Sequence, residues 1–187
     1  MLSSEKVKRR DAPRTKARIL AAAQQAFADL GYAQAGIRDI AQIAGVDSAL
    51  LLRYFGSKAK LFEAALIDAI PRFEPLDLAQ AGFGARLTEK FLEAFLDLRA
   101  QSMIALSTSD PDARLISTRV MEQYGIAPLA RWLGPPNART RAVRMMMLST
   151  GFMLYTRQIA LMSPDAALDT GTSQWLAESL QVIIDER

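Results

Sequence analysis

The chain has 187 residues, and half of them are hydrophobic, which is enough for one domain or two small ones around a buried core. It contains no Cys and no His, and this excludes disulfide frameworks, Cys/His zinc sites, thiol nucleophiles and Ser-His-Asp triads. The net charge of +3 is unevenly distributed: residues 1–60 hold 11 Lys or Arg against 5 Asp or Glu (+6), and residues 61–187 hold 12 against 15 (−3). This asymmetry indicates a module that binds a polyanion, joined to a mildly acidic body.

Residues 1–12 are polar and basic, and we expect them to form a flexible arm that adds affinity for a nucleic-acid backbone; the alternative is a solubilising tail. No apolar run resembling the core of a signal peptide follows the arm. Residues 145–156 form the longest uncharged apolar stretch near the C-terminus, and they are well short of the roughly 20 residues that span a bilayer. We therefore expect a cytoplasmic protein.

Residues 13–60 have helical periodicity throughout. Apolar residues three and four positions apart predict a first helix that Gly31 ends, and its predicted buried face comprises Leu20, Ala23, Phe27 and Leu30. A second helix carries apolar residues from Ile37 to Ala44 and ends at Gly45, and a third ends at Gly56. Ser57 is placed to cap a fourth helix, whose predicted buried face comprises Leu61, Phe62, Ala65 and Leu66.

The remaining chain, residues 61–187, predicts a larger helical domain with a Pro- and Gly-containing connector at residues 71–84. We expect a long helix over 85–106, a shorter pair over 110–133 interrupted near Gly125, a long helix over 137–162 and a last helix over 172–185. No segment alternates as a strand, so the predicted fold class is all-α.

Residues 37–55 have the pattern of a helix-turn-helix: two short helices joined at Gly45, where glycine adopts the left-handed backbone conformation that a tight turn needs. Val46 is placed to fill the angle between the helices, and Asp47 or Ser48 to cap the second one. An ordinary helical hairpin would show the same spacing. The +6 charge of the surrounding segment favours DNA binding.

Cations flank this motif. Lys58 and Lys60 stand in the first turn of the fourth helix, where they oppose the helix dipole, and a docked phosphate would explain their position. The alternative is two solvated lysines. The predicted DNA-contacting residues are Arg14, Arg38, Ser48, Ala49, Leu52, Arg53, Tyr54, Lys58 and Lys60.

Residues 18–66 strongly resemble the N-terminal domain of TetR-family transcriptional regulators. The resemblance lies in the words Arg18–Ala23, Phe27–Tyr32, Ile37–Ala41, Ala44–Val46, Tyr54-Phe55 and Ser57-Lys58. It implies a homodimer that inserts its third helix into the major groove of a palindromic operator, with Lys58 at the family's phosphate-contacting lysine position and Tyr54 at its aromatic position.

The sequence departs from the family pattern in two places. Gly36 stands where the family usually has a capping Thr or Ser, and residues 49–52 are Ala-Leu-Leu-Leu where a Thr and a Tyr are common. Leu52 can touch a thymine methyl group but cannot donate a hydrogen bond. The operator sequence is therefore expected to differ from those of relatives that carry Thr and Tyr.

The body is rich in Met and aromatic residues, which can line an adaptable apolar pocket or fill a core. The resemblance implies an effector cavity among the middle helices. The candidate pocket residues are Phe91, Phe95, Arg99, Met103, Met121, Tyr124, Trp132, Met146, Met153 and Gln158.

Two late helices carry apolar stripes that would form a four-helix dimer interface or pack within the protomer. The candidate interface residues are Val143, Met147, Thr150, Gly151, Leu154, Trp175, Leu176, Leu180, Ile183 and Ile184. Arg139, Arg141 and Arg144 begin one of these helices, and we interpret them as a solvated helix start.

The sequence and its resemblance together predict a ligand-responsive DNA-binding regulator. The resemblance implies a repressor released by a small apolar effector, with residues 62–70 as the link between the two domains. The alternative is a DNA-binding module without an effector, which acts through a protein partner or as an architectural protein. No Gly-rich phosphate loop, metal cluster or nucleophile–base pair is present, so we expect neither an enzyme nor a cofactor.

Overall fold

The computed structural model describes residues 3–70, 79–93, 97–159 and 170–186, with side chains from residue 12 onward except those of 157, 158 and 170. Within these ranges the regular structure is helical and contains no strand, so the predicted all-α fold is confirmed. The chain divides into two compact units: Met1–Pro71 with Arg99–Val120, and Arg72–Leu98 with Met121–Arg187. We describe each unit by itself.

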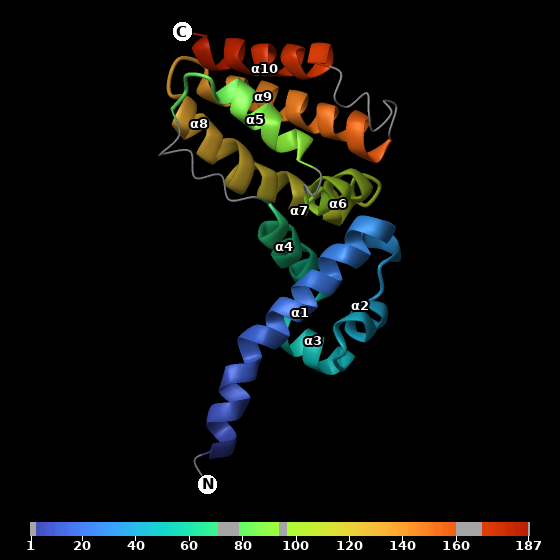
Figure 1. Ribbon diagram of the computed structural model, residues 1–187. Helices are drawn as coiled ribbons and strands as arrows, with labels where there is room; N and C mark the ends of the chain where they lie inside the picture. Colours follow the sequence, from blue (N-terminus) through green and yellow to red (C-terminus); the bar gives the residue numbers. More distant parts are fainter. Residues whose placement is uncertain (1–2, 71–78, 94–96, 160–169, 187) are drawn as a thin grey trace. The chain divides into compact units, whose positions relative to one another are not determined.

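The first unit is built on a long N-terminal helix. Its elements are α1 (Ser3–Gln34), α2 (Ile37–Ala44), α3 (Ser48–Phe55), α4 (Lys58–Ala69), α6 (Arg99–Ser107) and α7 (Pro111–Val120) (Figure 1). Helices α2, α4 and α6 pack against α1, and α7 packs against α4 and α6. The helix-turn-helix α2–α3 is therefore held by α1 and α4 within one unit.

The core of the first unit joins these helices through large side chains that are almost completely buried. Phe27 of α1 and Phe62 of α4 meet edge to face with ring centroids 5.1 Å apart, a favourable arrangement for aromatic rings. The predicted buried face of α4 is confirmed. On α1, Ala23 and Phe27 are buried as predicted, together with Ile19, Ala22 and Ala26 on the same stripe. Leu30 continues this stripe but is 48% exposed, directly before Gly31, whose backbone is not helical.

The second unit contains α5 (Phe83–Leu92), the π-helical segments η2 (Met121–Ile126) and η3 (Leu154–Gln158), and helices α8 (Ala127–Leu133), α9 (Ala138–Met153) and α10 (Thr170–Asp185). Helix α10 packs against both α5 and α9, as Figure 1 shows. A Cβ at Gly84 would lie 2.1 Å from the carbonyl oxygen of Ala177, so glycine at this position permits the close approach of α5 to α10. The predicted interruption near Gly125 coincides with η2.

The predicted long helix over 85–106 is wrong. Helix α5 ends at Leu92, and Glu93 has an extended backbone (φ −58°, ψ 132°) before α6 begins at Arg99. The reason is that the two apolar segments serve different cores: Phe91 is buried in the second unit and Met103 in the first. No Pro or Gly marks the break in the sequence, so helical periodicity alone predicts an uninterrupted helix here.

Two predicted boundaries also need correction. The segment 1–12, expected to be a flexible arm, is helical from Ser3 onward, with Pro13 inside α1. The predicted boundary at residue 60 does not coincide with the division by contacts, because α4, α6 and α7 belong to the same unit as the helix-turn-helix. Long-range packing decides this division, and it leaves no mark in the local sequence pattern.

Candidate nucleic-acid interface

The turn between α2 and α3 has the predicted chemistry. Gly45 adopts the left-handed conformation (φ 61°), and its N–H donates to the carbonyl of Gln42 at 3.0 Å, which closes the C-terminus of α2. Asp47 caps α3, because its Oδ1 accepts a 2.7 Å hydrogen bond from the N–H of Ala49. Val46 is half-buried against the core of the first unit. The helix-turn-helix geometry is therefore specified locally.

Arg18 fastens this turn to α1, which the sequence analysis did not anticipate. Its guanidinium donates to the carbonyl oxygens of Ala44 and, at 3.2 Å, Gly45, at the negative end of the α2 dipole. A Cβ at Gly45 would lie 2.8 Å from Nη2 of Arg18. Gly45 is thus needed for its backbone conformation, and a Cβ there would also displace the guanidinium of Arg18. The sequence signal for Arg18 is its place in the segment Arg18–Ala23, which resembles the TetR family, and this signal does not reveal the contact with the turn.

Helix α3 has one buried face and one exposed face. Leu51 and Phe55 are buried in the core of the first unit. The predicted DNA-contacting residues Ala49, Leu52 and Arg53 are exposed, and Ser48 and Tyr54 are half-buried. The outward face of α3 therefore presents a methyl group, an isobutyl group and a guanidinium group.

The N-terminus of α2 lacks a side-chain cap, as the glycine at position 36 predicts. Asp39 in the first turn supplies a negative charge there, and its Oδ2 would lie 2.5 Å from a Cβ at Gly36. The carboxylate occupies the space where a capping Thr or Ser would place its side chain. Arg38, the predicted contact on this helix, is exposed.

Lys58 is held against the protein surface. Its Nζ donates a 3.2 Å hydrogen bond to the carbonyl of Ala33 and lies 4.7 Å from the centroid of the Tyr32 ring, a cation–π contact. Burial lowers the pKa of the Lys58 ammonium, and the nearby charge of Asp110 partly opposes this shift. Burial also raises the pKa of the Tyr32 hydroxyl, to which Asp110 and Asp112 contribute. The alternative of two solvated lysines does not hold for Lys58.

The start of α4 is capped as predicted, because Oγ of Ser57 accepts a 3.2 Å hydrogen bond from the N–H of Lys60. The Lys60 side chain is exposed, and so is that of Arg14 on α1. Lys16, also on α1, lies with its Nζ 5.8 Å from the centroid of the Phe55 ring at the end of α3. Exposed cations thus stand on each of the helices α1, α2, α3 and α4 that form the helix-turn-helix and its immediate surroundings.

The candidate pocket residues belong to both units. Arg99 and Met103 are in the first unit, where Met103 is fully buried in the core, and Phe95 and the side chain of Gln158 lie outside the described residues. In the second unit Phe91 and Met153 are buried, Met121, Trp132 and Met146 are half-buried, and Tyr124 is 37% exposed. Met103 therefore fills the core of the first unit. The residues in and near η2 are more accessible, and they are the better candidates for a ligand pocket.

The candidate interface residues divide by exposure. Leu176, Leu180, Ile183 and Ile184 are buried in the core of the second unit, so the prediction that this stripe faces a partner is corrected: it packs within the protomer. Met147 and Trp175 are exposed at 68% and 53%. The half-buried candidates are Val143, Thr150, Gly151 and Leu154.

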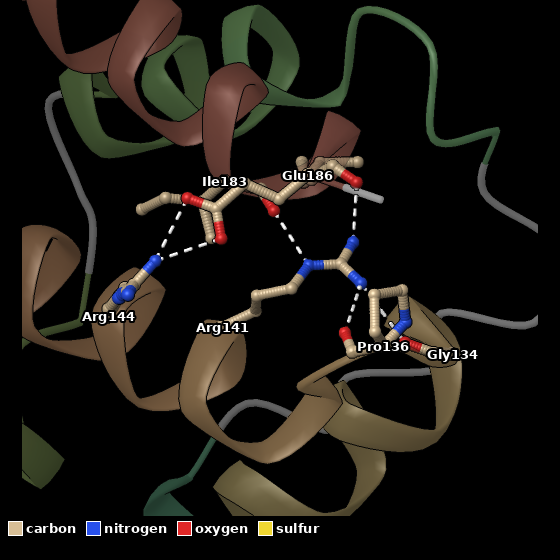
Figure 2. A network of polar contacts seen from close by, with 7 residues as sticks. Gly134, Pro136, Arg141, Arg144, Ile183 and Glu186 are labelled. Atoms are coloured by element: carbon tan, nitrogen blue, oxygen red, sulfur yellow. Dashed lines mark hydrogen bonds and ion pairs between the residues drawn. The ribbon is translucent and has the colours of Figure 1, made fainter.

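The interpretation of Arg139, Arg141 and Arg144 as a solvated helix start is wrong for Arg141, which is only 2% exposed (Figure 2). Its guanidinium donates to the carbonyls of Ile183 (2.8 Å) and Ile184 (2.5 Å) at the end of α10, and to those of Gly134 (3.0 Å) and Pro136 (3.2 Å). The negative ends of two helices therefore surround this buried cation. Arg139 and Arg144 are exposed and pair with Glu122 and Glu186.

An all-helical chain with a capped helix-turn-helix and exposed cations on the surrounding helices defines the helix-turn-helix class of DNA-binding proteins. Residues 19–65 match the bacterial regulatory proteins of the tetR family, and residues 81–184 match the tetracyclin repressor-like C-terminal domain. The chain belongs to the TetR family of transcriptional regulators, as its sequence resemblance indicates.

Solved structures share this fold. GusR of Salmonella enterica is 20% identical, with 94% of this chain and 98% of that chain covered and a TM-score of 0.72. NalD, the secondary repressor of the MexAB-OprM multidrug efflux pump in Pseudomonas aeruginosa, is 19% identical (91% and 95% covered, TM-score 0.64). The fatty acid degradation regulator FadR of Bacillus halodurans is 19% identical (89% and 96% covered, TM-score 0.64). No curated protein sequence matches this chain significantly.

Among the helices that the structure describes, none combines the length and the apolar character that crossing a membrane requires.

Proposed function

We propose that this regulator is a repressor that binds a palindromic operator as a homodimer and dissociates from it when a small apolar effector binds. The observation that carries the proposal is the outward face of α3, where Ala49, Leu52 and Arg53 are exposed on the second helix of a helix-turn-helix. The +6 charge of residues 1–60 supplies attraction for the DNA backbone.

Phosphate contacts are assigned to Lys58 and Lys60 at the start of α4. An ammonium group has three N–H donors, and the hydrogen bond from Lys58 to Ala33 uses one of them. The contact with Tyr32 restricts the lysine before DNA binds, so less side-chain entropy is lost when a phosphate oxygen arrives. Arg38 and Arg53 are exposed and available for the backbone or for base edges.

The proposed dimer uses the exposed apolar side chains of the second unit. Met147, Gly151 and Tyr155 follow at intervals of four along α9 and η3, which places them on one face. Tyr155 is 52% exposed, and a Cβ at Gly151 would meet no atom within 4 Å, so this face is open to a second helix. Trp175 and Val182, seven residues apart on α10, are exposed at 53% and 62%. Apolar side chains exposed to this extent on two helices suit a four-helix interface between copies.

The effector is assigned to the region around Gly125 in η2. The Cε atoms of Met121 and Met146 lie 3.2 Å and 3.3 Å from the position of a Cβ at Gly125, so two flexible thioether chains meet at this glycine. Short π-helical segments inside α-helices are frequent at functional sites. Of the structural relatives, NalD is described as a repressor of a multidrug efflux pump and FadR as a regulator of fatty acid degradation. By analogy with these two regulators we infer an apolar effector for this chain.

The experiment that tests the function is a gel shift with the full chain and fragments of the genomic DNA that flanks its own gene. We expect a retarded complex with a palindromic fragment whose affinity falls steeply as the salt concentration rises. The same complex is then titrated with fatty acids and hydrophobic antibiotics, and release by one of them supports the effector. Absence of any salt-sensitive complex with genomic DNA would refute the function, whereas a stable complex that no apolar compound releases would refute the effector alone.

A further inference from the structure

We propose that Leu52, with the methyl group of Ala49 beside it, recognises the C5-methyl group of thymine, so that each operator half-site contains a thymine facing these side chains. The inference rests on the proposed function and adds to it the base that the protein selects. It starts from an anomaly of α3, an eight-residue helix whose outward face includes a leucine that is 41% exposed.

Leu52 lies on the side of α3 that is exposed. Leu51 and Phe55 are directed into the core of the first unit, so residues on the opposite side of the helix point away from it. Ala49 and Leu52 are three residues apart and are neighbours on that outward side. A single exposed leucine elsewhere would need no explanation, but the second helix of a helix-turn-helix places its outward side chains against base edges in the major groove.

An apolar side chain in the major groove can distinguish thymine from the other three bases. In the major groove adenine, guanine and cytosine present hydrogen-bond donors and acceptors, whereas thymine adds a methyl group. A leucine packed against a donor or an acceptor removes water from it without replacing the hydrogen bond, which is unfavourable. Packed against a thymine methyl group, the same leucine buries apolar surface on both sides, which is favourable.

The neighbours of Leu52 along α3 include a cation and no carboxylate. Helix α3 contains no Asp or Glu, and the carboxylate of Asp47 at its N-terminus is engaged by the N–H of Ala49. Arg53 follows Leu52 directly and is exposed, so a cation stands next to the apolar pair. The face therefore combines attraction for DNA with a surface that cannot satisfy the polar edges of the other three bases.

The test uses the full chain and an operator selected from random double-stranded DNA. Synthetic duplexes carry deoxyuridine in place of each thymine in turn, which removes only the methyl group, and dissociation constants are measured by fluorescence anisotropy at one salt concentration. We expect uracil to weaken binding about fourfold for each half-site at one or two positions and to have no effect elsewhere. Leu52→Ala should bind the thymine and uracil duplexes equally at those positions.

The matched control is Leu115→Ala, because Leu115 is an exposed leucine (68%) on α7, away from the recognition motif, and its variant should keep the wild-type discrimination. The uracil series with the wild-type chain needs no variant at all. Sequence-specific binding that is indifferent to uracil at every position would overturn this inference and leave the proposed function standing. Discrimination against uracil that persists in Leu52→Ala would also overturn it, and absence of all DNA binding would refute both proposals.

Discussion

The ammonium group of Lys58 lies over the ring of Tyr32, with Nζ 4.7 Å from the ring centroid, and donates to the neighbouring carbonyl of Ala33. The contact joins the first turn of α4 to the C-terminal end of α1. Tyr32 in turn lies edge-on to Phe62 with ring centroids 5.2 Å apart, so the lysine is connected to the core of the first unit through an aromatic pair. The proposed phosphate contact is thus part of the structural framework of the DNA-binding motif.

Replacement of Lys58 by Ala should therefore have two effects. The affinity for all DNA sequences should fall about equally, and the slope of log K against log salt concentration should decrease by about one, as expected for one lost phosphate contact. The free energy of unfolding should also fall by about 1 kcal/mol, because the cation–π contact and one hydrogen bond are lost. Lys90→Ala is the matched control, since Lys90 is exposed on α5 in the second unit. If Lys58→Ala and Lys90→Ala have the same DNA affinity in gel shifts and the same free energy of unfolding in urea, the assignment of a phosphate contact to Lys58 is contradicted.

Alkaline pH should reduce DNA binding through Lys58. Burial lowers its pKa below the ordinary value of 10.5, so its charge is lost at a lower pH than that of a solvated lysine. Lys58→Arg keeps the charge, because arginine does not titrate in this range. Anisotropy titrations at constant ionic strength from about pH 8 to about pH 10 should show the wild-type affinity falling before that of the arginine variant. Parallel profiles for the two proteins would count against a phosphate contact at Lys58.

The titrations of Lys58 and Tyr32 should change the free energy of unfolding in opposite directions as the pH rises. The folded pKa of Lys58 is lowered, so the unfolded chain binds more protons and this contribution to stability rises with pH toward 10.5. The folded pKa of Tyr32 is raised above 10.0, so its contribution is present below that value and is lost as pH rises through the folded pKa. Tyr32→Phe should remove the second effect, and its free energy of unfolding should decline less steeply above pH 10.0 than that of the wild type, as measured by urea unfolding.

Replacement of Arg141 by Met should destabilise the second unit strongly. The variant leaves the carbonyls of Ile183, Ile184, Gly134 and Pro136 without their donor in a buried site, and we expect a loss of about 2–4 kcal/mol. Arg139→Met is a close control on the same helix, because Arg139 is exposed and pairs only with Glu122 at the surface. The midpoints of urea unfolding measure this difference, and we expect a much lower midpoint for Arg141→Met than for Arg139→Met. Similar midpoints for the two variants would contradict a structural role for the buried Arg141.

A methyl group at Gly45 should disturb the recognition motif. Gly45→Ala forces a residue with a Cβ into φ 61° and places that Cβ 2.8 Å from the guanidinium of Arg18. We expect a loss of about 1–2 kcal/mol of stability and weaker DNA binding, because the angle between α2 and α3 depends on this turn. Gly151→Ala offers a contrast, since its Cβ would meet no atom within 4 Å, and its free energy of unfolding at low protein concentration should not decrease.

The proposed dimer predicts twice the protomer mass at micromolar concentration. Trp175→Glu should raise the dimer dissociation constant about tenfold or more, because a large exposed aromatic side chain is replaced by a charge at the interface. Leu115→Glu introduces the same charge at an exposed leucine of the first unit and should leave the mass unchanged. Sedimentation equilibrium measures both, and a wild-type monomer would refute the interface.

Local sequence rules predicted the helix-turn-helix well. Gly45 at the end of α2 and Ser57 as the cap of α4 act on backbone groups within three residues, and both predictions are confirmed. Of the two predicted candidates for the cap of α3, Asp47 and Ser48, the structure has Asp47. The same rules missed the break before α6, because neither Pro nor Gly occurs there. Periodicity identifies the apolar face that carries Leu176 and Leu180, but it does not show whether a partner or the protomer core covers that face. In the structure the core of the second unit covers it.

The sequence alone determined the family, the all-helical class and the location of the recognition helix, because these depend on short-range spacing, capping and composition. Only the tertiary structure decided the roles of individual charges. Arg141 and Arg139 are two residues apart on one helix, yet the first is buried among four carbonyls and the second is exposed. Lys58 and Lys60 are also two residues apart, and Lys58 is half-buried against Tyr32 and Ala33 whereas Lys60 is exposed. The reason in both pairs is long-range, because the carbonyls and the aromatic ring that contact a side chain come from distant parts of the chain.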